Sequence, residues 1–422
     1  MLIAMLAIIG LVVDSGLVHA ARRQARRAAD AASQAGAVMM LSGTNAAQRA
    51  NATAAAFQYA GLNGVNTNGN VVVQTPPEAS SGSAYAGSNG YIFVQVTVPV
   101  NTTFLRLITT QQTVSVTAAA TGGIKIGPCP AAVVVLHPSD SGAMSVKGGA
   151  QLTIPGGTIG VNSSSASAVN LTGGSSLTCS NLSVVGGISG TVTANFVLTG
   201  VAPMADPFGY LALPVITSSS QVTYGDGVTA STSPDSGGTA ASPSLATPSG
   251  TVTLRPGIYW GGIRINGGNI TFQPGRYVLA GGGFSVSGSP TITGTNIVFY
   301  NTRDPYSGSA AAGYAEINVA GSSAVALKAP TRDADAVYGG FLFINDRANS
   351  EDINLSGGSS TASSGPLSGF LYGAASDFKV TGGGFLGGLG AIVRTMTVSG
   401  NAQFSALDVS RIPGITTVAL ME

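Results

Sequence analysis

The chain has 422 residues, which is long enough for two or three domains. Its formal net charge is +1, and 8% of its residues are charged, against about 25% in a typical soluble domain. This balance argues against nucleic acid as a partner, because a nucleic-acid-binding surface is strongly basic. The 60 glycines and the many serines and threonines indicate a hydroxyl-rich surface, which suits an exported, repetitive β protein.

The first 37 residues predict one continuous helix, because alanine, arginine and glutamine all favour helix. Residues 1–13 are apolar apart from Gly10, and an alanine-rich stretch dense in arginine follows. Arg26 and Arg27 stand four and three residues before Asp30, so either could pair with it on one helix face. An apolar end followed by a basic, polar end predicts a membrane anchor that rises into water.

Residues 14–37 resemble the N-terminal helix of the TadG/TadE-like proteins of the Flp (Tad) pilus-assembly system. In both, the apolar run ends in Asp-x-Gly, and Ala-Arg-Arg-Gln, Ala-Ala-Asp-Ala-Ala and Ala-Gly-Ala follow in that order. The positions that carry the pattern here are Asp14, Gly16, Arg22, Arg23, Asp30 and Gly36. The resemblance implies a single-pass membrane protein whose bulk lies outside the cytoplasm, in the periplasm or beyond, and whose partners are the membrane and other pilus or secretion subunits.

A second interpretation of this segment is a signal peptide that is cleaved after Ala20. A bilayer-spanning helix needs about 20 apolar residues, and residues 1–13 supply fewer. A signal peptide needs a basic start, which is missing here, so we favour the anchor. We expect the apolar run to be longer, with basic residues ahead of it, in the native product.

Residues 42–127 predict a further helix and a few strands. Good helix formers fill 42–59, while residues 70–74, 91–100 and 113–119 alternate and are rich in β-branched side chains. One long helix followed by a few strands resembles a pilin in outline. We therefore expect an anchor-helix domain at 1–60 and a small strand-rich, pilin-like segment at 61–127.

From residue 128 onward, short alternating segments recur and each ends in a glycine turn. The segments include MSVKGGAQLTI from Met144, VNLTGGSSLTC from Val169, IRINGGNITF from Ile263, FSVSGSPTIT from Phe284, INVAGSSAVAL from Ile317, INLSGGSS from Ile353, FKVTGG from Phe378 and MTVSGNAQF from Met396. Such repeats predict a mainly β fold, with a parallel β-helix (solenoid-like) ectodomain at 128–422. An irregular β-sandwich is the alternative.

Alternation predicts which side chains of these segments point inward. The expected core positions are Val146, Val169, Leu171, Ile263, Ile265, Val286, Val319, Leu355, Val380 and Val398. Their polar neighbours, such as Arg264 and Lys379, should face outward. Residues 218–250, rich in serine, threonine, glycine and proline, predict a long exposed insertion.

Little in the chain points to catalysis. His19 and His137 are the only histidines, which excludes a multi-histidine zinc site, and no cofactor motif is convincing. Acidic residues at 332–352 could line a groove or bind calcium, but a solvated loop is the simpler interpretation. Cys129 and Cys179 could form one disulfide in an oxidising compartment. The aromatic residues that could stack on sugars are Tyr259, Trp260, Tyr277, Tyr300, Tyr306 and Tyr314.

We therefore expect a membrane-anchored, surface-exposed and non-enzymatic protein of a Flp/Tad-type pilus assembly or adhesion system, without cofactor or metal. Two alternatives remain open. One is an exported carbohydrate-binding or carbohydrate-active β-helix protein, for which a surface polysaccharide would be the ligand. The other is a self-assembling surface-layer protein, suggested by the glycine, serine and threonine content.

Overall fold

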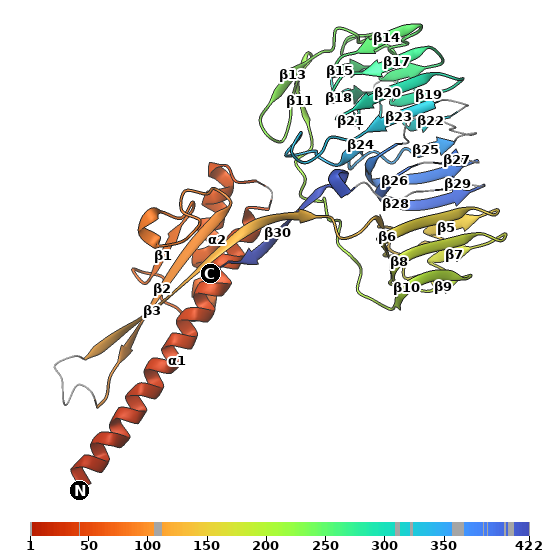
Figure 1. Cartoon of the computed structure of the whole chain (residues 1–422). Helices are drawn as coiled ribbons and strands as arrows, with labels where there is room; N and C mark the ends of the chain where they lie inside the picture. The colour runs from red at the N-terminus through yellow and green to blue at the C-terminus, as the bar shows by residue number, and fades with distance from the viewer. Residues whose placement is uncertain are drawn as a thin grey trace. The chain divides into compact units, whose positions relative to one another are not determined.

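The computed structural model describes residues 2–41, 43–104, 112–308, 313–320, 324–356, 367–382, 384–385, 387–400, 402–403 and 409–421. The chain is mainly β and folds into two compact units. Unit 1 comprises Met1–Gly127 and Thr416–Glu422, and unit 2 comprises Pro128–Ile415. Unit 2 is therefore inserted into the chain of unit 1 (Figure 1).

Unit 1 consists of two helices and a four-stranded sheet of order β1-β2-β3-β30. The helix expected at the start of the chain is confirmed as α1, a single helix of 38 residues. The elements of unit 1 are α1 (Leu2–Met39), α2 (Ala46–Leu62), β1 (Val71–Gln74), the 3₁₀ turn η1 (Ala79–Ser81), β2 (Tyr91–Asn101), β3 (Thr113–Pro128) and β30 (Gly414–Leu420). All four elements predicted within 42–127 are present, and β3 runs nine residues further than expected.

Small side chains let α1 lie close to α2 and β2. A row of buried alanines runs along one face of the helix, at Ala21, Ala25, Ala28, Ala29, Ala32 and Ala37. A Cβ at Gly36 would lie 2.4 Å from Ile92 Cδ1 and 3.1 Å from Ala52 O, so only glycine fits there without a shift. The sheet supplies the larger apolar partners, including Ile92 and Val94.

Unit 2 is built from short strands. They are β4 (Val133–Val135), β5 (Met144–Lys147), β6 (Gln151–Val161), β7 (Val169–Leu171), β8 (Ser176–Val184), β9 (Ile188–Ser189), β10 (Val192–Thr199), β11 (Val215–Ser218), β12 (Gln221–Thr223), β13 (Thr229–Ser231), β14 (Thr251–Leu254), β15 (Gly257–Trp260), β16 (Ile263–Ile265), β17 (Asn269–Phe272), β18 (Gly275–Ala280), β19 (Phe284–Val286), β20 (Thr291–Thr295), β21 (Ile297–Thr302), β22 (Ile317–Val319), β23 (Ala324–Lys328), β24 (Phe341–Asn345), β25 (Ile353–Ser356), β26 (Gly369–Thr381), β27 (Gly384–Phe385), β28 (Leu389–Ser399) and β29 (Ala402–Gln403), with a 3₁₀ turn η3 (Val409–Arg411).

Most of these strands pair in parallel, in three ladders. The first is β14-β17-β20-β23. The second is β15-β18-β21-β24-β26-β28-β4-β6-β8-β10. The third is β16-β19-β22-β25-β26-β28-β5-β7-β9. This pairing excludes the antiparallel sandwich that the sequence left open.

The inward positions predicted from the repeats are confirmed. All ten aliphatic side chains are at most 8% exposed and belong to one hydrophobic core. The third ladder aligns Ile265, Val286, Val319, Leu355, Val380, Val398, Val146 and Leu171 in one row. Arg264 is exposed and Lys379 half-buried as expected, whereas Ser145 is buried. Residues 321–323, 357–360, 383, 401 and 404 of the quoted segments lie outside the described residues.

The chain does not traverse this stack from one end to the other. It enters at β4, near the middle, and winds to β10 at one end (Figure 1). It resumes with β14 and β15 at the other end and winds back, until β28 pairs with β4 and β5. Residues 200–250, which we call the strap, connect the two ends.

The strap corrects one expectation, since the insertion at 218–250 is not a fully exposed loop. Val222, Tyr224 and Ala240 are buried in a second apolar cluster, together with the outward side chains of the second ladder. Strap backbone groups also bond to the stack, as Ser233 N does to Ile258 O at 3.0 Å. The polar composition predicted an exposed loop. A few buried apolar residues are nevertheless enough to hold the strap against the stack, because its backbone is also hydrogen-bonded to it.

Candidate functional site

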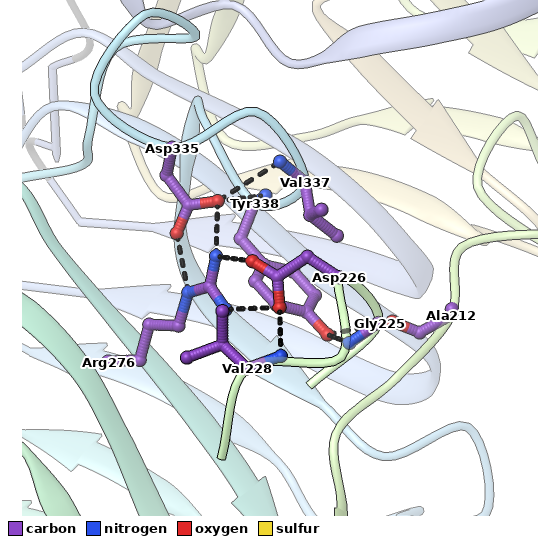
Figure 2. A network of polar contacts seen from close by, with 8 residues as sticks. All are labelled: Ala212, Gly225, Asp226, Val228, Arg276, Asp335, Val337 and Tyr338. Atoms are coloured by element: carbon purple, nitrogen blue, oxygen red, sulfur yellow. Dashed lines mark hydrogen bonds and ion pairs between the residues drawn. The ribbon is translucent and has the colours of Figure 1, made fainter. Parts of the chain in front are cut away.

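The densest polar cluster within unit 2 surrounds Arg276, on β18 (Figure 2). Its Nε and Nη2 donate to Asp335 at 2.7 and 2.9 Å. Its Nη1 and Nη2 donate to Asp226 at 3.1 and 2.6 Å. Asp226 lies in the strap, on the turn between β12 and β13, and Asp335 lies in the loop before β24. One guanidinium therefore joins three segments that are distant in sequence.

Two tyrosines enclose the same guanidinium. Its Cζ lies 4.7 Å from the ring centroid of Tyr224 and 4.9 Å from that of Tyr338. Tyr338 also donates from its hydroxyl to Ala212 O at 2.8 Å and accepts from Gly225 N at 3.1 Å, so it holds the strap at two further points. Burial raises the pKa of Tyr338 to about 12 and that of Tyr224 further, which keeps both hydroxyls neutral.

The ionisation of the cluster follows from its hydrogen bonds. Burial opposes protonation of Arg276, but the bonds to Asp226 and Asp335 outweigh it and raise the pKa of the guanidinium. The hydrogen bond from Arg276 holds the pKa of Asp226 below its ordinary value. The side chain of Asp335 is 9% exposed and also accepts from the amides of Val337 and Tyr338. The hydrogen bonds between Arg276 and Asp226 thus favour the charged forms of these two side chains.

An open cleft of about 470 Å³ adjoins the cluster. Its walls are formed by strap residues, by the Pro-Gly turns that precede β15 and β18, and by residues that precede β21 and β24: Tyr224, Val228, Ala230, Pro256, Gly257, Pro274, Gly275, Arg276, Asn296, Pro330, Ala334 and Asp335. Arg276 and Asp335 are each bonded to protein groups, and no histidine or thiol lines the cleft. The bonds of Arg276 to Asp226 fix the strap to β18.

The acidic residues that the sequence placed together at 332–352 separate in the structure. Asp335 binds Arg276, Asp346 accepts from the hydroxyls of Tyr300 and Thr302, and Asp352 binds Lys379. Within the described ranges, no group of three or more His, Cys, Asp or Glu side chains could hold a metal. Neither an acidic groove nor a calcium site therefore forms from this stretch.

The aromatic residues considered for stacking on sugars mostly pack inside unit 2. Tyr259, Trp260, Tyr277 and Tyr300 are at most 5% exposed, so sugars cannot stack on them. Tyr306 is 44% exposed, and Tyr314 is half-buried.

The two cysteines are free in this structure, so the expected disulfide is not formed. Cys129 belongs to the second apolar cluster, which includes the buried strap residues, and Cys179 belongs to the hydrophobic core that contains the ten predicted inward side chains. The Cys129 thiol donates to Ala131 O at 3.3 Å. Burial raises the pKa of both thiols, that of Cys179 to about 11.

In unit 1, the motif residues of the N-terminal helix have distinct surroundings. The Asp14 carboxylate is 4% exposed and accepts from the amides of Thr103 and Phe104, both at 2.9 Å. Gly10, one helical turn earlier, leaves room for the Phe104 ring, since a Cβ there would lie 2.5 Å from it. Asp14 and Gly10 thus fasten the far end of the β2–β3 hairpin to α1.

The remaining motif residues divide into packing and surface positions. Gly36 is at the close contact with β2 and α2, whereas nothing lies within 4 Å of a Cβ at Gly16. Arg22 and Arg23 are exposed, as are Arg26 and Arg27. Asp30 is half-buried, and the expected ion pairs from Arg26 or Arg27 to it are absent among the described residues.

The N-terminal half of α1 presents large apolar side chains to its surroundings. Leu11 and Val12 are 60% and 66% exposed, and Val13 and Leu17 are more than 40% exposed. The sequence continues this apolar run through residues 2–9. We call residues 2–17 the apolar arm. Across the described part of the chain, no helix combines the length and the hydropathy that crossing a bilayer requires.

Comparison with known proteins adds no relative. The chain matches no family model, no curated protein and no solved structure.

Proposed function

We propose that this chain is a membrane-attached, non-enzymatic subunit of a Flp/Tad-type pilus assembly or adhesion system, with its bulk outside the cytoplasm. The observation that carries the proposal is the apolar arm, whose exposed Leu11, Val12, Val13 and Leu17 have no apolar cover within the described part of unit 1. Monomeric soluble proteins rarely expose a contiguous patch of this kind, which marks a membrane or protein interface. The helix resemblance at residues 14–37 supplies the pilus context.

The position of Asp14 supports membrane attachment. An acidic group at the bilayer centre would cost about 2.5–3.5 kcal/mol even on the most lenient scale. Here two backbone amides satisfy the carboxylate, in a pocket that unit 1 itself provides. Asp14 therefore suits the membrane interface, with the exposed apolar side chains on both sides of it in the helix seated in lipid.

For unit 2 we propose a parallel β-helix, in which the three ladders are the faces of successive coils. Its support is the spacing of paired residues, such as Ile258 with Val278 and Val278 with Tyr300, together with the continuous inward rows. A charge-poor stack of this kind suits a scaffold or adhesive surface better than an enzyme. The carbohydrate-active alternative would need a carboxylate pair flanking a bond in an open groove, whereas Asp335, Asp352 and Asp377 are each paired with a basic side chain.

Vesicle flotation tests the attachment. The full chain should float with neutral phosphatidylcholine vesicles, and the double variant Leu11→Asp/Val12→Asp should stay at the bottom of the gradient. The matched control Val215→Asp/Val228→Asp changes two comparably exposed apolar residues of unit 2 and should float like the wild type. Equal flotation of the arm variant and the control would refute the arm as the attachment site.

The pilus assignment needs a cellular test. Deletion of the gene in its native cell should reduce surface filaments or adhesion, and the wild-type chain should restore them. The Leu11→Asp/Val12→Asp variant should fail to restore them, while Val215→Asp/Val228→Asp should succeed. Normal filaments and adhesion after deletion would contradict the proposed role.

A further inference from the structure

We infer that Arg22, Arg23, Arg26 and Arg27 form a binding surface for anionic phospholipid headgroups. The inference rests on the proposed membrane attachment and names the class of lipid that the attachment prefers. These four residues hold four of the 18 basic side chains of the chain within six positions of α1. We call them the arginine belt.

The arginine belt is available for an external partner. All four side chains are exposed, while the alanines between and beside them, Ala21, Ala25, Ala28 and Ala29, are buried. Within the described residues, none of the four arginines makes an ion pair. By contrast, Arg255, Arg276 and Arg394 of unit 2 are each paired with an aspartate. Among the described residues, these four adjacent positive charges thus have no ion-pair partner.

Their position relative to the apolar arm favours a lipid headgroup over other anions. Leu17 is the last large exposed apolar residue of the arm. At a rise of about 1.5 Å per residue, Arg22 lies about 7.5 Å and Arg27 about 15 Å beyond it along the helix. Long arginine side chains extend toward the interface and shorten this distance. With the arm in lipid, the belt lies at or within about one Debye length of the phosphate layer.

Arginine is also chemically suited to this role. Its guanidinium donates pairs of hydrogen bonds to phosphate oxygens, and basic residues next to a membrane-inserted helix attract anionic lipids. The overall charge of the chain cannot replace the belt, because the net charge is only +1. The selectivity for anionic lipid is therefore expected to reside in these four residues.

The test compares full-chain binding to phosphatidylcholine vesicles with binding to vesicles that also contain phosphatidylglycerol. Each arginine near an anionic surface strengthens binding by roughly fivefold, so the quadruple variant Arg22→Gln/Arg23→Gln/Arg26→Gln/Arg27→Gln should lose at least about tenfold on the anionic vesicles. Its binding to neutral vesicles should be unchanged. High salt should lower wild-type binding to anionic vesicles toward the neutral value.

Two further variants define the result. The quadruple Arg→Lys variant keeps the charge and should retain most of the anionic preference. The control Lys125→Gln/Lys147→Gln/Arg264→Gln/Arg332→Gln removes the same charge elsewhere and should behave as the wild type. The helical circular dichroism of every variant should match that of the wild type.

Each other outcome is decisive. Equal wild-type binding to neutral and anionic vesicles overturns the inference and leaves the proposed attachment intact. If the control variant with Lys125→Gln loses as much binding to anionic vesicles as the belt variant does, the effect is one of net charge. That result also overturns the inference. If both quadruple glutamine variants keep the preference for anionic vesicles, the inference is overturned. The belt would then be assigned to a different partner, such as an acidic protein. Failure of the wild type to bind any vesicle refutes the attachment as well.

Discussion

Arg276 joins the strap to β18 and to the loop before β24 through two aspartates. Removing its guanidinium would leave Asp335, which is 9% exposed, and Asp226 without their shared counterion. Loss of one partner of a buried pair is costly because the other charge stays desolvated. Arg255 provides a contrast, since its side chain is 52% exposed and it pairs with a single aspartate, Asp235.

We predict that Arg276→Gln lowers the free energy of unfolding of unit 2 by about 3 kcal/mol, whereas Arg255→Gln has a much smaller effect because solvent screens its ion pair. Trp260 is the single tryptophan of the chain, is 1% exposed and donates to Thr232 of the strap, so its fluorescence reports on this region. Denaturant unfolding followed by that signal compares the two variants. Equal midpoints would contradict the role of Arg276.

Acid should release the same contact. The hydrogen bond from Arg276 depresses the pKa of Asp226 in the folded state. The stability it contributes is therefore complete above the ordinary aspartate pKa of about 3.9 and is lost as the pH falls through the depressed value. Asp226→Asn should flatten the pH dependence of the Trp260 unfolding midpoint below about pH 4. An unchanged slope would show that Asp226 does not titrate in this way.

The thiols of Cys129 and Cys179 should be unreactive until the chain unfolds. Burial raises the pKa of both, so the thiolate is scarce at about pH 8 as well as inaccessible. Maleimide labelling without reductant is expected to be slow for the native chain and to modify both cysteines in denaturant. Protection that persists in denaturant and disappears with reductant would instead indicate a disulfide.

At the scale of single elements, helix α1 depends on small residues for its contacts. A side chain at Gly36 would have to displace Ile92 and press against Ala52 O, while the position of Gly16 is open. We predict that Gly36→Leu destabilises unit 1 by about 1–3 kcal/mol, as overpacking does. Gly16→Leu should be neutral or stabilise by up to about 0.8 kcal/mol through helix propensity. Thermal loss of the helical circular dichroism distinguishes them, and equal transitions would contradict the packing account.

The ladders of unit 2 predict a similar contrast between faces. Val286 points into the core and is 1% exposed. Arg264 lies on the adjacent strand of the same ladder, pairs with Ser285 and is exposed. Val286→Asp buries an unpaired charge and should cost about 4 kcal/mol or more, while Arg264→Ser should stay within about 0.5 kcal/mol. The Trp260 unfolding midpoint measures both. A mild effect of Val286→Asp would place that side chain outside the core.

The inward-facing residues of the strands could be predicted from the sequence, whereas the contacts between distant segments could not. Alternation with a period of two identified Val286 and its equivalents, because each segment fixes its own inward face. The same reasoning could not find the Arg276 cluster, whose partners Asp226 and Asp335 stand 50 and 59 residues away and meet it only in the folded chain. The strap was missed for a related reason, since Val222 and Tyr224 are isolated apolar residues in a polar stretch.

At the scale of the whole molecule, the chain passes between the two units twice, once at each end of unit 2. Unit 2 begins at Pro128 and ends at Ile415, and Cys129 N bonds to Pro413 O at 2.9 Å. Both junctions of unit 2 therefore lie near the middle of its stack, where β28 meets β4. The flanking strands β3 and β30 are neighbours in the sheet of unit 1.

The central claim is that the apolar arm attaches the chain to a membrane and that unit 2 lies outside the cytoplasm. Val215→Cys introduces an accessible thiol at a position that is 61% exposed, whereas Cys129 and Cys179 are buried. In spheroplasts of the native cell, a membrane-impermeant maleimide should label this variant, and the labelled chain should sediment with the membranes. Labelling that appears only after lysis would contradict the account.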